Sequence, residues 1–200
     1  MNSDERIDSS LSGSTCIAGL YTPSRFYCIN VGDSRCVLFK YFKSENIWTF
    51  SDLSRDHKPS YINEKNRILS QGGKVESYIG EEGNPVGPER VWALEVENKG
   101  VPGLAMSRSF GDQIAHSVGV VVNPEILEHN FNEEDKIILL ASDGIWEFME
   151  NEEVLNIVKK YYEQNNTEEA LEEIYKEADK RWRENEGIVD DITAIILFLE

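Results

Sequence analysis

Three aspartates share a position that suits metal chemistry. Asp33 and Asp143 each follow a run of apolar residues, and Asp190 precedes one. Each therefore lies where a predicted strand meets a turn, and carboxylates at strand ends can converge at the rim of a sheet. Converging carboxylates repel one another unless a cation neutralises them, and hard oxygen ligands suit Mg²⁺ or Mn²⁺. Taken singly, each aspartate is more typical of an ordinary turn.

The sequence lacks the residue patterns that several other catalytic chemistries need. A cysteine-dependent phosphatase needs five residues between its cysteine and an arginine, and from Cys28 the nearest arginine, Arg35, is one residue too far. A phosphate-binding P-loop is excluded because Gly73-Lys74 is followed by Val75. The three histidines are scattered without zinc-site spacing, and no Gly-x-Ser-x-Gly nucleophile motif occurs.

Composition narrows the class of protein and its partners. The formal charge of −17 disfavours nucleic acid and anionic membranes as partners. No apolar run approaches the roughly 20 residues that cross a membrane. Three cysteines in apolar settings suggest reduced, buried thiols and an intracellular protein, cytoplasmic or nuclear. Residues 1–11 are polar and predict a flexible segment without a signal peptide, followed by one domain over residues 12–200.

Short β-rich runs dominate the first half of the chain, and helical patterns follow later. Expected strands cover residues 16–21, 26–31, 36–42, 47–50, 91–96, 118–122, 126–129, 136–141 and 193–199. Short connections between the early runs indicate antiparallel pairing. This order predicts an α+β fold in which helices cover antiparallel sheets.

Three helices are expected between and after these strands. The first begins near Ser60, with an apolar stripe of Ile62, Ile68 and Leu69, and ends at Gly72. Two amphipathic helices follow the strand 136–141, and Thr167 is the expected N-cap of the second. Residues 74–103 are rich in Gly, Pro and charge, and predict a long irregular excursion.

Seven short motifs occur in one order along the chain. They are Ser12-Gly13-Ser14-Thr15, Asn30-Val31-Gly32-Asp33-Ser34-Arg35, Asp56-His57-Lys58-Pro59, Gly72-Gly73, Ala105-Met106-Ser107-Arg108-Ser109-Phe110-Gly111-Asp112, Ala141-Ser142-Asp143-Gly144-Ile145-Trp146 and Asp190-Asp191-Ile192-Thr193. This series resembles the type 2C (PPM) protein phosphatase family, and the stretch 90–104 is similar to plant and protist members in particular. The resemblance runs from about Ser12 to the last residue.

The resemblance implies a fold and an activity. The fold is a sandwich of two antiparallel sheets flanked by helices, four layers in the order α-β-β-α. The activity is hydrolysis of phosphoserine and phosphothreonine in phosphorylated proteins by a water that two Mg²⁺ or Mn²⁺ ions activate, without a phosphoenzyme. Residues 74–103 overlap the variable flap of the family, which would contribute to substrate choice.

Site residues follow from the same resemblance, position by position. Asp143 and Asp190 match the aspartates that hold one metal of the pair, and Asp33 with Asp143 matches a third, weaker metal site. Glu147 stands where that third site usually has Asp and is one methylene longer. Asp191 replaces a usual Asn, and its charge either raises the pKa of a neighbouring carboxylate or strengthens cation attraction.

One family segment does not occur in the sequence. Family members begin with an acidic strand and an Asp-Gly-His-Gly-Gly segment, which supply the bridging aspartate and a general-acid histidine. The sequence is therefore interpreted as the C-terminal portion of a catalytic domain without its first strands, and open strand edges would invite association. The alternative is a catalytically inactive regulatory or binding module on the same fold.

Overall fold

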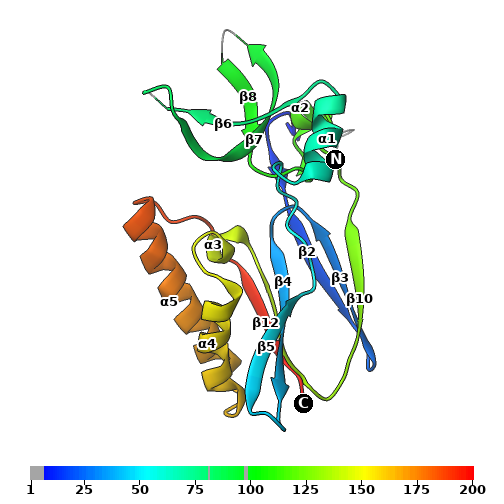
Figure 1. The fold of residues 1–200 in the computed structure, drawn as a ribbon, viewed down its shortest axis with the longest axis vertical. Coiled ribbons are helices and arrows are strands. Elements are labelled where there is room, and N and C mark those ends of the chain that lie inside the picture. The colour runs from blue at the N-terminus through cyan, green and yellow to red at the C-terminus, as the bar shows by residue number, and fades with distance from the viewer. Residues whose placement is uncertain (1–6, 81, 97–98) are drawn as a thin grey trace. The chain divides into compact units, whose positions relative to one another are not determined.

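The computed structural model describes residues 7–80, 82–96 and 99–200, and they form two compact units (Figure 1). Unit 1 consists of Met1–Cys16, Val31–Asp33 and Asp56–Pro124, and unit 2 of Ile17–Asn30, Ser34–Arg55 and Glu125–Glu200. The chain crosses between the units several times, so each is assembled from segments far apart in sequence. Each unit is described by itself below.

A four-stranded antiparallel sheet forms the centre of unit 2, in the order β12-β11-β4-β5. Its strands are β4 (Arg35–Phe42), β5 (Ile47–Asp52), β11 (Asp135–Ala141) and β12 (Ala194–Phe198). All but one of the residues of β11 are buried, because the strand is central and both faces of the sheet are covered. Its side chains alternate between those faces, as strand geometry requires.

A second antiparallel sheet packs against the first, in the order β10-β3-β2. Its strands are β2 (Cys16–Tyr21), β3 (Arg25–Val31) and β10 (Glu125–Asn130). Phe26 and Cys28 from β3 enter one core with Leu38 from β4 and Ile138 and Leu140 from β11. The two sheets therefore form a sandwich whose interior is this core.

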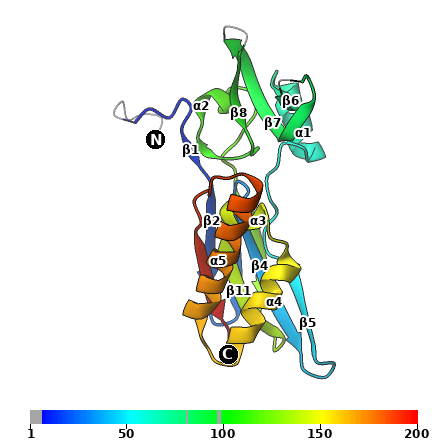
Figure 2. The same ribbon diagram turned by 90° about the vertical axis from the view of Figure 1, so that its left-hand side faces the viewer.

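Helices cover the other face of the four-stranded sheet (Figure 2). They are α3 (Asp143–Trp146), α4 (Asn151–Tyr162) and α5 (Thr167–Asn185). Val154 and Val158 of α4 and Ile174 of α5 pack on Ile137 and Leu139 of β11. None of the helices in the described ranges is both long and apolar enough to cross a membrane.

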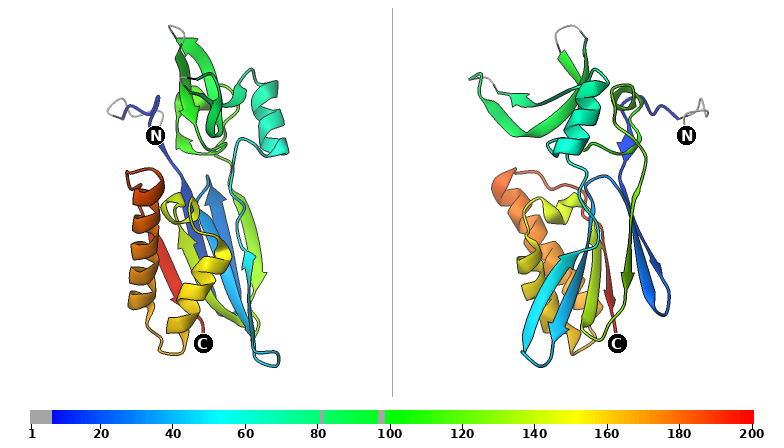
Figure 3. Two further views of the ribbon diagram at one scale, coloured as in Figure 1. Left: turned by 60° about the vertical axis from the view of Figure 1, so that its left-hand side comes forward. Right: turned by 45° about the vertical axis from the view of Figure 1, so that its right-hand side comes forward.

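The predicted α+β fold with two antiparallel sheets is confirmed. Within unit 2, the described residues make three of the four expected layers, namely helices, sheet and sheet (Figure 3). On the outer face of the β10-β3-β2 sheet, Ile126 is 63% exposed.

Unit 1 contains a three-stranded antiparallel sheet where the sequence predicted an irregular excursion. Its strands are β6 (Lys74–Ile79), β7 (Pro85–Val96) and β8 (Lys99–Leu104), in the order β6-β7-β8. The prediction is wrong, and the strands were missed because few of their described side chains are buried: Val75 and Val91 enter the core, while β6 exposes Lys74, Glu76 and Tyr78. Register shifts further break the alternation that identifies strands.

The remaining elements of unit 1 are short. They are β1 (Gly13–Ser14), paired with β9 (Phe110–Gly111), and the helices α1 (Ile62–Ser70) and α2 (Gln113–His116). The expected strand over residues 118–122 is wrong, because that segment makes only one isolated bridge, from Val121 to Arg108. The stripe predicted for α1 is also partly wrong: Ile68 is buried, whereas Ile62 and Leu69 are exposed and Glu64 is buried instead.

The first residues of unit 1 that the structure describes are bonded to α2. The carbonyl of Ser9 accepts from the Gln113 N–H at 3.0 Å, and that of Ser10 accepts from the Ile114 N–H at 3.2 Å. The proposed flexible segment 1–11 lies partly outside the described residues, and its boundary with a domain over 12–200 stays a prediction. Of the three cysteines expected to be buried, Cys28 and Cys36 are, but Cys16 is exposed; all three are free thiols.

Candidate metal centre

Asp143 and Asp190 flank two paired strands of unit 2. Asp143 is separated by one residue from the end of β11, and Asp190 precedes β12 by a short turn. The last pair of the β11–β12 ladder joins Ala141 to Ala194. The antiparallel register therefore brings the segment after β11 beside the segment before β12.

Ser142 joins these two segments beyond the ladder. Its backbone N–H donates to the Thr193 carbonyl at 3.0 Å. Its hydroxyl oxygen accepts from the Thr193 N–H at 3.1 Å and donates to the Asp191 carbonyl at 3.1 Å. One small side chain thus fixes the backbone before Asp143 against the backbone after Asp190.

Gly144 allows the two segments to approach closely. A Cβ at this position would lie 2.5 Å from the Asp191 carbonyl oxygen, a separation that real Cβ atoms do not show. Glycine after Asp143 is therefore required by contact with the Asp190–Asp191 segment. In the sequence, Asp143-Gly144 is a common turn motif. The close approach to the Asp191 carbonyl is a second reason for glycine at position 144.

Two tryptophans hold the turn that carries Asp143. The Trp146 indole N–H donates to the Ala141 carbonyl at 3.0 Å, and the Trp182 indole N–H donates to the Gly144 carbonyl at 2.7 Å. Trp182 in turn packs edge-on against Phe148, with ring centroids 4.7 Å apart. The two indole hydrogen bonds therefore fix the backbone on both sides of Asp143.

The carboxylates themselves differ in exposure. Asp143 is half-buried, while Glu147, Asp190 and Asp191 are exposed. Asp190 accepts the N–H of Asp191 on its Oδ1 at 2.7 Å. Across the described ranges, no group of three or more His, Cys, Asp or Glu side chains is placed to hold a metal ion. Carboxylate oxygens are the kind of ligand that hard divalent cations prefer, and the assignment of Asp143, Asp190 and Glu147 as metal ligands stays a prediction.

Asp33 belongs to unit 1 and has a partner there. It is 2% exposed, and its Oδ2 accepts from the Lys58 Nζ at 2.8 Å. A buried carboxylate needs such a cation because desolvation penalises its charge. The ion pair with Lys58 accounts for the burial of the Asp33 carboxylate without a metal. The assignment of Asp33 as a metal ligand stays a prediction.

Several of the sequence motifs meet around Asp33 within unit 1. The Gly32 N–H donates to His57 Nδ1 at 3.0 Å, and the His57 N–H donates to the Gly32 carbonyl at 3.0 Å. The His57 carbonyl accepts from the Ser107 N–H at 2.8 Å. Gly32 has a φ of 110°, and a Cβ there would meet Thr15. The motifs around residues 15, 32, 57 and 107 therefore fix one another's backbone.

Glu64 organises a second buried network in unit 1. Its carboxylate accepts from the Arg108 Nη2 at 2.8 Å, the Arg67 Nη2 at 2.8 Å and the Ser107 hydroxyl at 2.6 Å. Burial alone would raise the pKa of Glu64, but hydrogen bonds from Arg108, Arg67 and Ser107 outweigh it and hold that pKa far below its usual range. Ser107 and Arg108 thus hold the buried Glu64 carboxylate in place.

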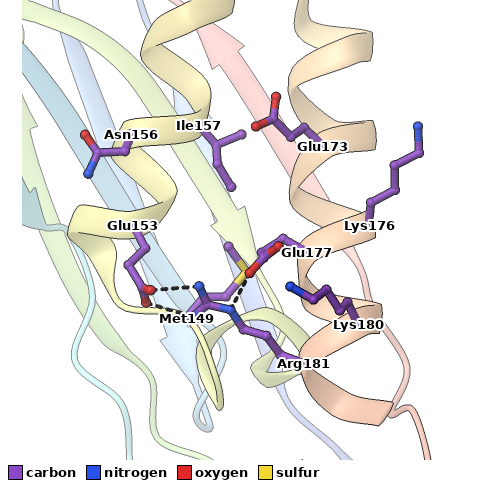
Figure 4. A pocket seen from close by; sticks show the side chains of 9 residues that line it. All are labelled: Met149, Glu153, Asn156, Ile157, Glu173, Lys176, Glu177, Lys180 and Arg181. Atoms are coloured by element: carbon purple, nitrogen blue, oxygen red, sulfur yellow. Dashed lines mark hydrogen bonds and ion pairs between the residues drawn. The ribbon is translucent and has the colours of Figure 1, made fainter. Parts of the chain in front are cut away.

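A hollow of about 450 Å³ lies between α4 and α5 (Figure 4). Arg181 crosses it and pairs with Glu153 at 2.7 Å and with Glu177 at 2.8 Å. The Arg181 hydrogen bonds lower the pKa of Glu153 to about 2, aided by the Glu150 N–H. None of the predicted metal ligands lines this hollow, and its charges serve to join the two helices.

Comparison with known proteins decides the family. The family model described as PP2C, protein phosphatase 2C, matches residues 1–187. This chain belongs to the protein phosphatase 2C family. An Arabidopsis thaliana protein named "Probable protein phosphatase 2C 35" is 34% identical, with 97% of this chain and 58% of the relative covered. An Oryza sativa subsp. japonica protein named "Probable protein phosphatase 2C 48" is also 34% identical, with 99% and 55% covered.

Solved structures of the family share the fold. A serine-threonine phosphatase 2C from Toxoplasma gondii has a TM-score of 0.81 at 21% identity, covering 98% of this chain and 61% of that one. The serine/threonine phosphatase Stp1 from Staphylococcus aureus has a TM-score of 0.56 at 18% identity, covering 94% and 57%. This chain therefore spans about half to three fifths of the length of these type 2C relatives, and the resemblance to plant members is confirmed.

Proposed function

We propose that this chain supplies one side of the metal centre of a protein serine/threonine phosphatase. The observation that carries the proposal is the Ser142 bridge, which holds the Asp143 turn beside the Asp190–Asp191 turn. Membership of the protein phosphatase 2C family gives these carboxylates their chemistry. The substrates would be phosphoserine and phosphothreonine in proteins.

Asp143 and Asp190 would hold one divalent cation, Mg²⁺ or Mn²⁺, of a pair. When bound, such cations neutralise phosphoryl charge and lower the pKa of water. Ser142, Gly144 and the two indole N–H bonds orient the Asp143 turn, so the carboxylate loses little freedom on binding. Asp191 adds a negative charge that would attract the cation without being required as a ligand.

Asp33 and Glu147 would each contribute to weaker binding of a further cation, as the family resemblance implies. A cation there must compete with Lys58 for the Asp33 carboxylate, which makes the site weak by construction. Glu147 is exposed, so its side chain would lose rotamer freedom on holding a cation, which also makes binding there weak.

The test is hydrolysis of a phosphothreonine peptide by a polypeptide that joins this chain to a family Asp-Gly-His-Gly-Gly segment. We expect turnover with Mn²⁺ or Mg²⁺ and none with a chelator present. Asp143→Ala should abolish turnover, and activity that survives this substitution would contradict the proposal. For the 200-residue chain alone we expect weak metal binding and little turnover.

A second candidate is a catalytically inactive regulatory module of the same family. It is favoured by the described residues of the chain, among which no group of three or more His, Cys, Asp or Glu side chains is placed to hold a metal ion. The same assay separates the candidates, because an inactive module stays inactive when the segment is supplied.

Association and location complete the proposal. In the described sheets of unit 2, β2, β10, β5 and β12 are edge strands, and exposed edges can pair with another chain. We expect concentration-dependent self-association in size-exclusion chromatography.

Free cysteines suit an intracellular protein, in the cytoplasm or nucleus, which fractionation of tagged protein would test.

A further inference from the structure

The loop from α5 to β12 carries an exposed isoleucine close to a proposed metal ligand. Ile188 is 78% exposed, the highest value among the large apolar side chains in the described ranges. It lies two positions before Asp190, so the Cα atoms of the two residues are at most about 7 Å apart. The hydrophobic cores of unit 2 do not include this side chain, and the proposed metal chemistry does not use it.

The start of this loop is held by the turn that carries Asp143. The Gly187 N–H donates to the Trp182 carbonyl at 3.2 Å, and the Trp182 indole N–H donates to the Gly144 carbonyl at 2.7 Å. Gly187 has a φ of 74°, a left-handed conformation that favours glycine and ends α5 at this point. Ile188 comes next, so its backbone is tied through Trp182 to the Asp143 turn.

The end of the loop is held by the same turn. The Asp191 carbonyl accepts from the Ser142 hydroxyl at 3.1 Å. Figure 1 shows the loop at the same end of unit 2 as α3, whose first residue is Asp143. Because both ends of the loop are fixed, Ile188 is presented at that end of unit 2.

A partly exposed aromatic pair lies next to the loop. Trp182 and Phe148 are half-buried, and their rings pack edge-on with centroids 4.7 Å apart. A single exposed apolar side chain is common on protein surfaces and needs no function. Ile188 differs because it follows Gly187, which is bonded to Trp182, and so adds to apolar surface beside the proposed metal ligands.

We propose that Ile188 selects the phosphoprotein substrate by contacting an apolar side chain near the phosphorylated residue. This inference rests on the proposed function, because it requires the phosphate to be bound beside Asp143 and Asp190. Two residues of an extended peptide span about 7 Å, which matches the separation of Ile188 from Asp190 along the chain. The apolar side chain of the substrate would therefore stand two positions before or after the phosphorylated residue.

The test uses the polypeptide that joins this chain to a family Asp-Gly-His-Gly-Gly segment, and two phosphothreonine peptides of equal charge. One peptide has leucine two positions before and two positions after phosphothreonine, and the other has serine at both places. We expect kcat/KM with Mn²⁺ to be about fivefold higher for the leucine peptide, because contact with Ile188 removes apolar surface from water. Ile188→Ser should remove this preference, and its folding should be unaffected because the side chain is exposed.

Ile47→Ser is the matched control. Ile47 is 47% exposed and pairs with Phe42, at the end of β4 remote from the Arg35–Ala141 pair. It is therefore an exposed isoleucine of unit 2 that lies roughly 20 Å from the end of β11 that precedes Asp143. Ile47→Ser should keep the full preference for the leucine peptide.

A second readout does not depend on turnover. A phosphonate analogue of the leucine peptide, which cannot be hydrolysed, is added to the same polypeptide with isotope-labelled isoleucine methyl groups. The methyl signal that disappears in Ile188→Ser should shift in the nuclear magnetic resonance spectrum, and the signal that disappears in Ile47→Ser should not.

Three results would overturn the inference: equal kcat/KM for the two peptides, a leucine preference that Ile188→Ser retains, or an Ile188 methyl signal that stays unshifted at saturation. Hydrolysis of p-nitrophenyl phosphate, which has no flanking residues, tests the proposed function separately. If the unaltered polypeptide hydrolyses it without preferring the leucine peptide, only this inference fails. If it hydrolyses neither kind of substrate, the proposed function fails and the inference fails with it.

Discussion

Ser142 joins the two segments that carry the proposed metal ligands. Its hydroxyl accepts a hydrogen bond from the Thr193 N–H and donates one to the Asp191 carbonyl, both in the segment that follows Asp190. We predict that Ser142→Ala lowers the free energy of unfolding by about 1–2 kcal/mol, because two backbone groups lose a partner. Urea denaturation measures this.

Thr193→Val is the control for that measurement. Thr193 contributes its backbone N–H and carbonyl to the bridge, and the substitution leaves both in place. A Ser142→Ala variant as stable as Thr193→Val would show that the bridge does not hold the two segments.

Glu64 is the residue whose charge matters most in unit 1. We predict that Glu64→Gln lowers stability by about 3 kcal/mol, because Arg67 and Arg108 lose their buried counter-charge. The folded-state pKa is far below the unfolded value, so this stabilisation is present above about pH 4.3 and is lost as the pH falls below it. Thermal unfolding at pH 7 and at low pH should show the wild-type and variant proteins converging in acid. A stability difference that does not depend on pH would contradict this account.

At the scale of elements, Arg181 and Glu153 join α5 to the start of α4. Glu153 also accepts the Glu150 N–H at 2.9 Å and thereby closes a capping box. Because Glu153 is partly exposed, we predict only about 1 kcal/mol of destabilisation from Glu153→Gln at pH 7. With its pKa lowered to about 2, the contribution fades as the pH falls from about 4.3 toward 2.

Glu152→Gln is the matched control, since Glu152 lies in the same first turn and is exposed. Chemical denaturation of both variants at pH 7 measures the difference. Similar losses in the two variants would mean that Glu153 acts only through general charge near the helix start.

The elements of unit 2 were the more predictable part of the fold. The strand 136–141 and the two helices after it have strong apolar patterns, because each packs a full face on one core. Exact helix starts were less predictable: Asn166 caps α5, accepting the Glu169 N–H, although Thr167 was expected. Two adjacent polar residues can each cap a helix, so the sequence does not distinguish them.

The sheet of unit 1 was unpredictable for the opposite reason. Few of the described side chains in its strands are buried and the strands carry bulges, so no alternation marks them. The buried Glu64 on α1 was also unforeseen, because its partners Arg67 and Arg108 include one 44 residues away in sequence. Polar networks of this kind depend on tertiary contacts that local pattern does not report.

At the scale of the molecule, the predicted metal ligands belong to both units: Asp143 and Asp190 belong to unit 2, and Asp33 belongs to unit 1. The β11–β12 pair brings the segment after Ala141 beside the segment before Ala194 in unit 2, and the convergence of the Asp143 and Asp190 carboxylates stays a prediction. Asp33 belongs to unit 1 and is paired with Lys58, a partner that strand patterns could not indicate. The sequence therefore predicted the family, whereas hydrogen-bond and ion-pair partners such as Lys58 could be found only in the structure.

The central claim is that Asp143 and Asp190 hold one divalent cation. It is tested most directly by titrating the 200-residue chain with Mn²⁺ and measuring free Mn²⁺ by electron paramagnetic resonance. We predict that Asp143→Asn and Asp190→Asn each weaken binding at least about tenfold, whereas Asp191→Asn retains binding close to that of the unaltered chain. Equal Mn²⁺ affinity in all these proteins would contradict the claim.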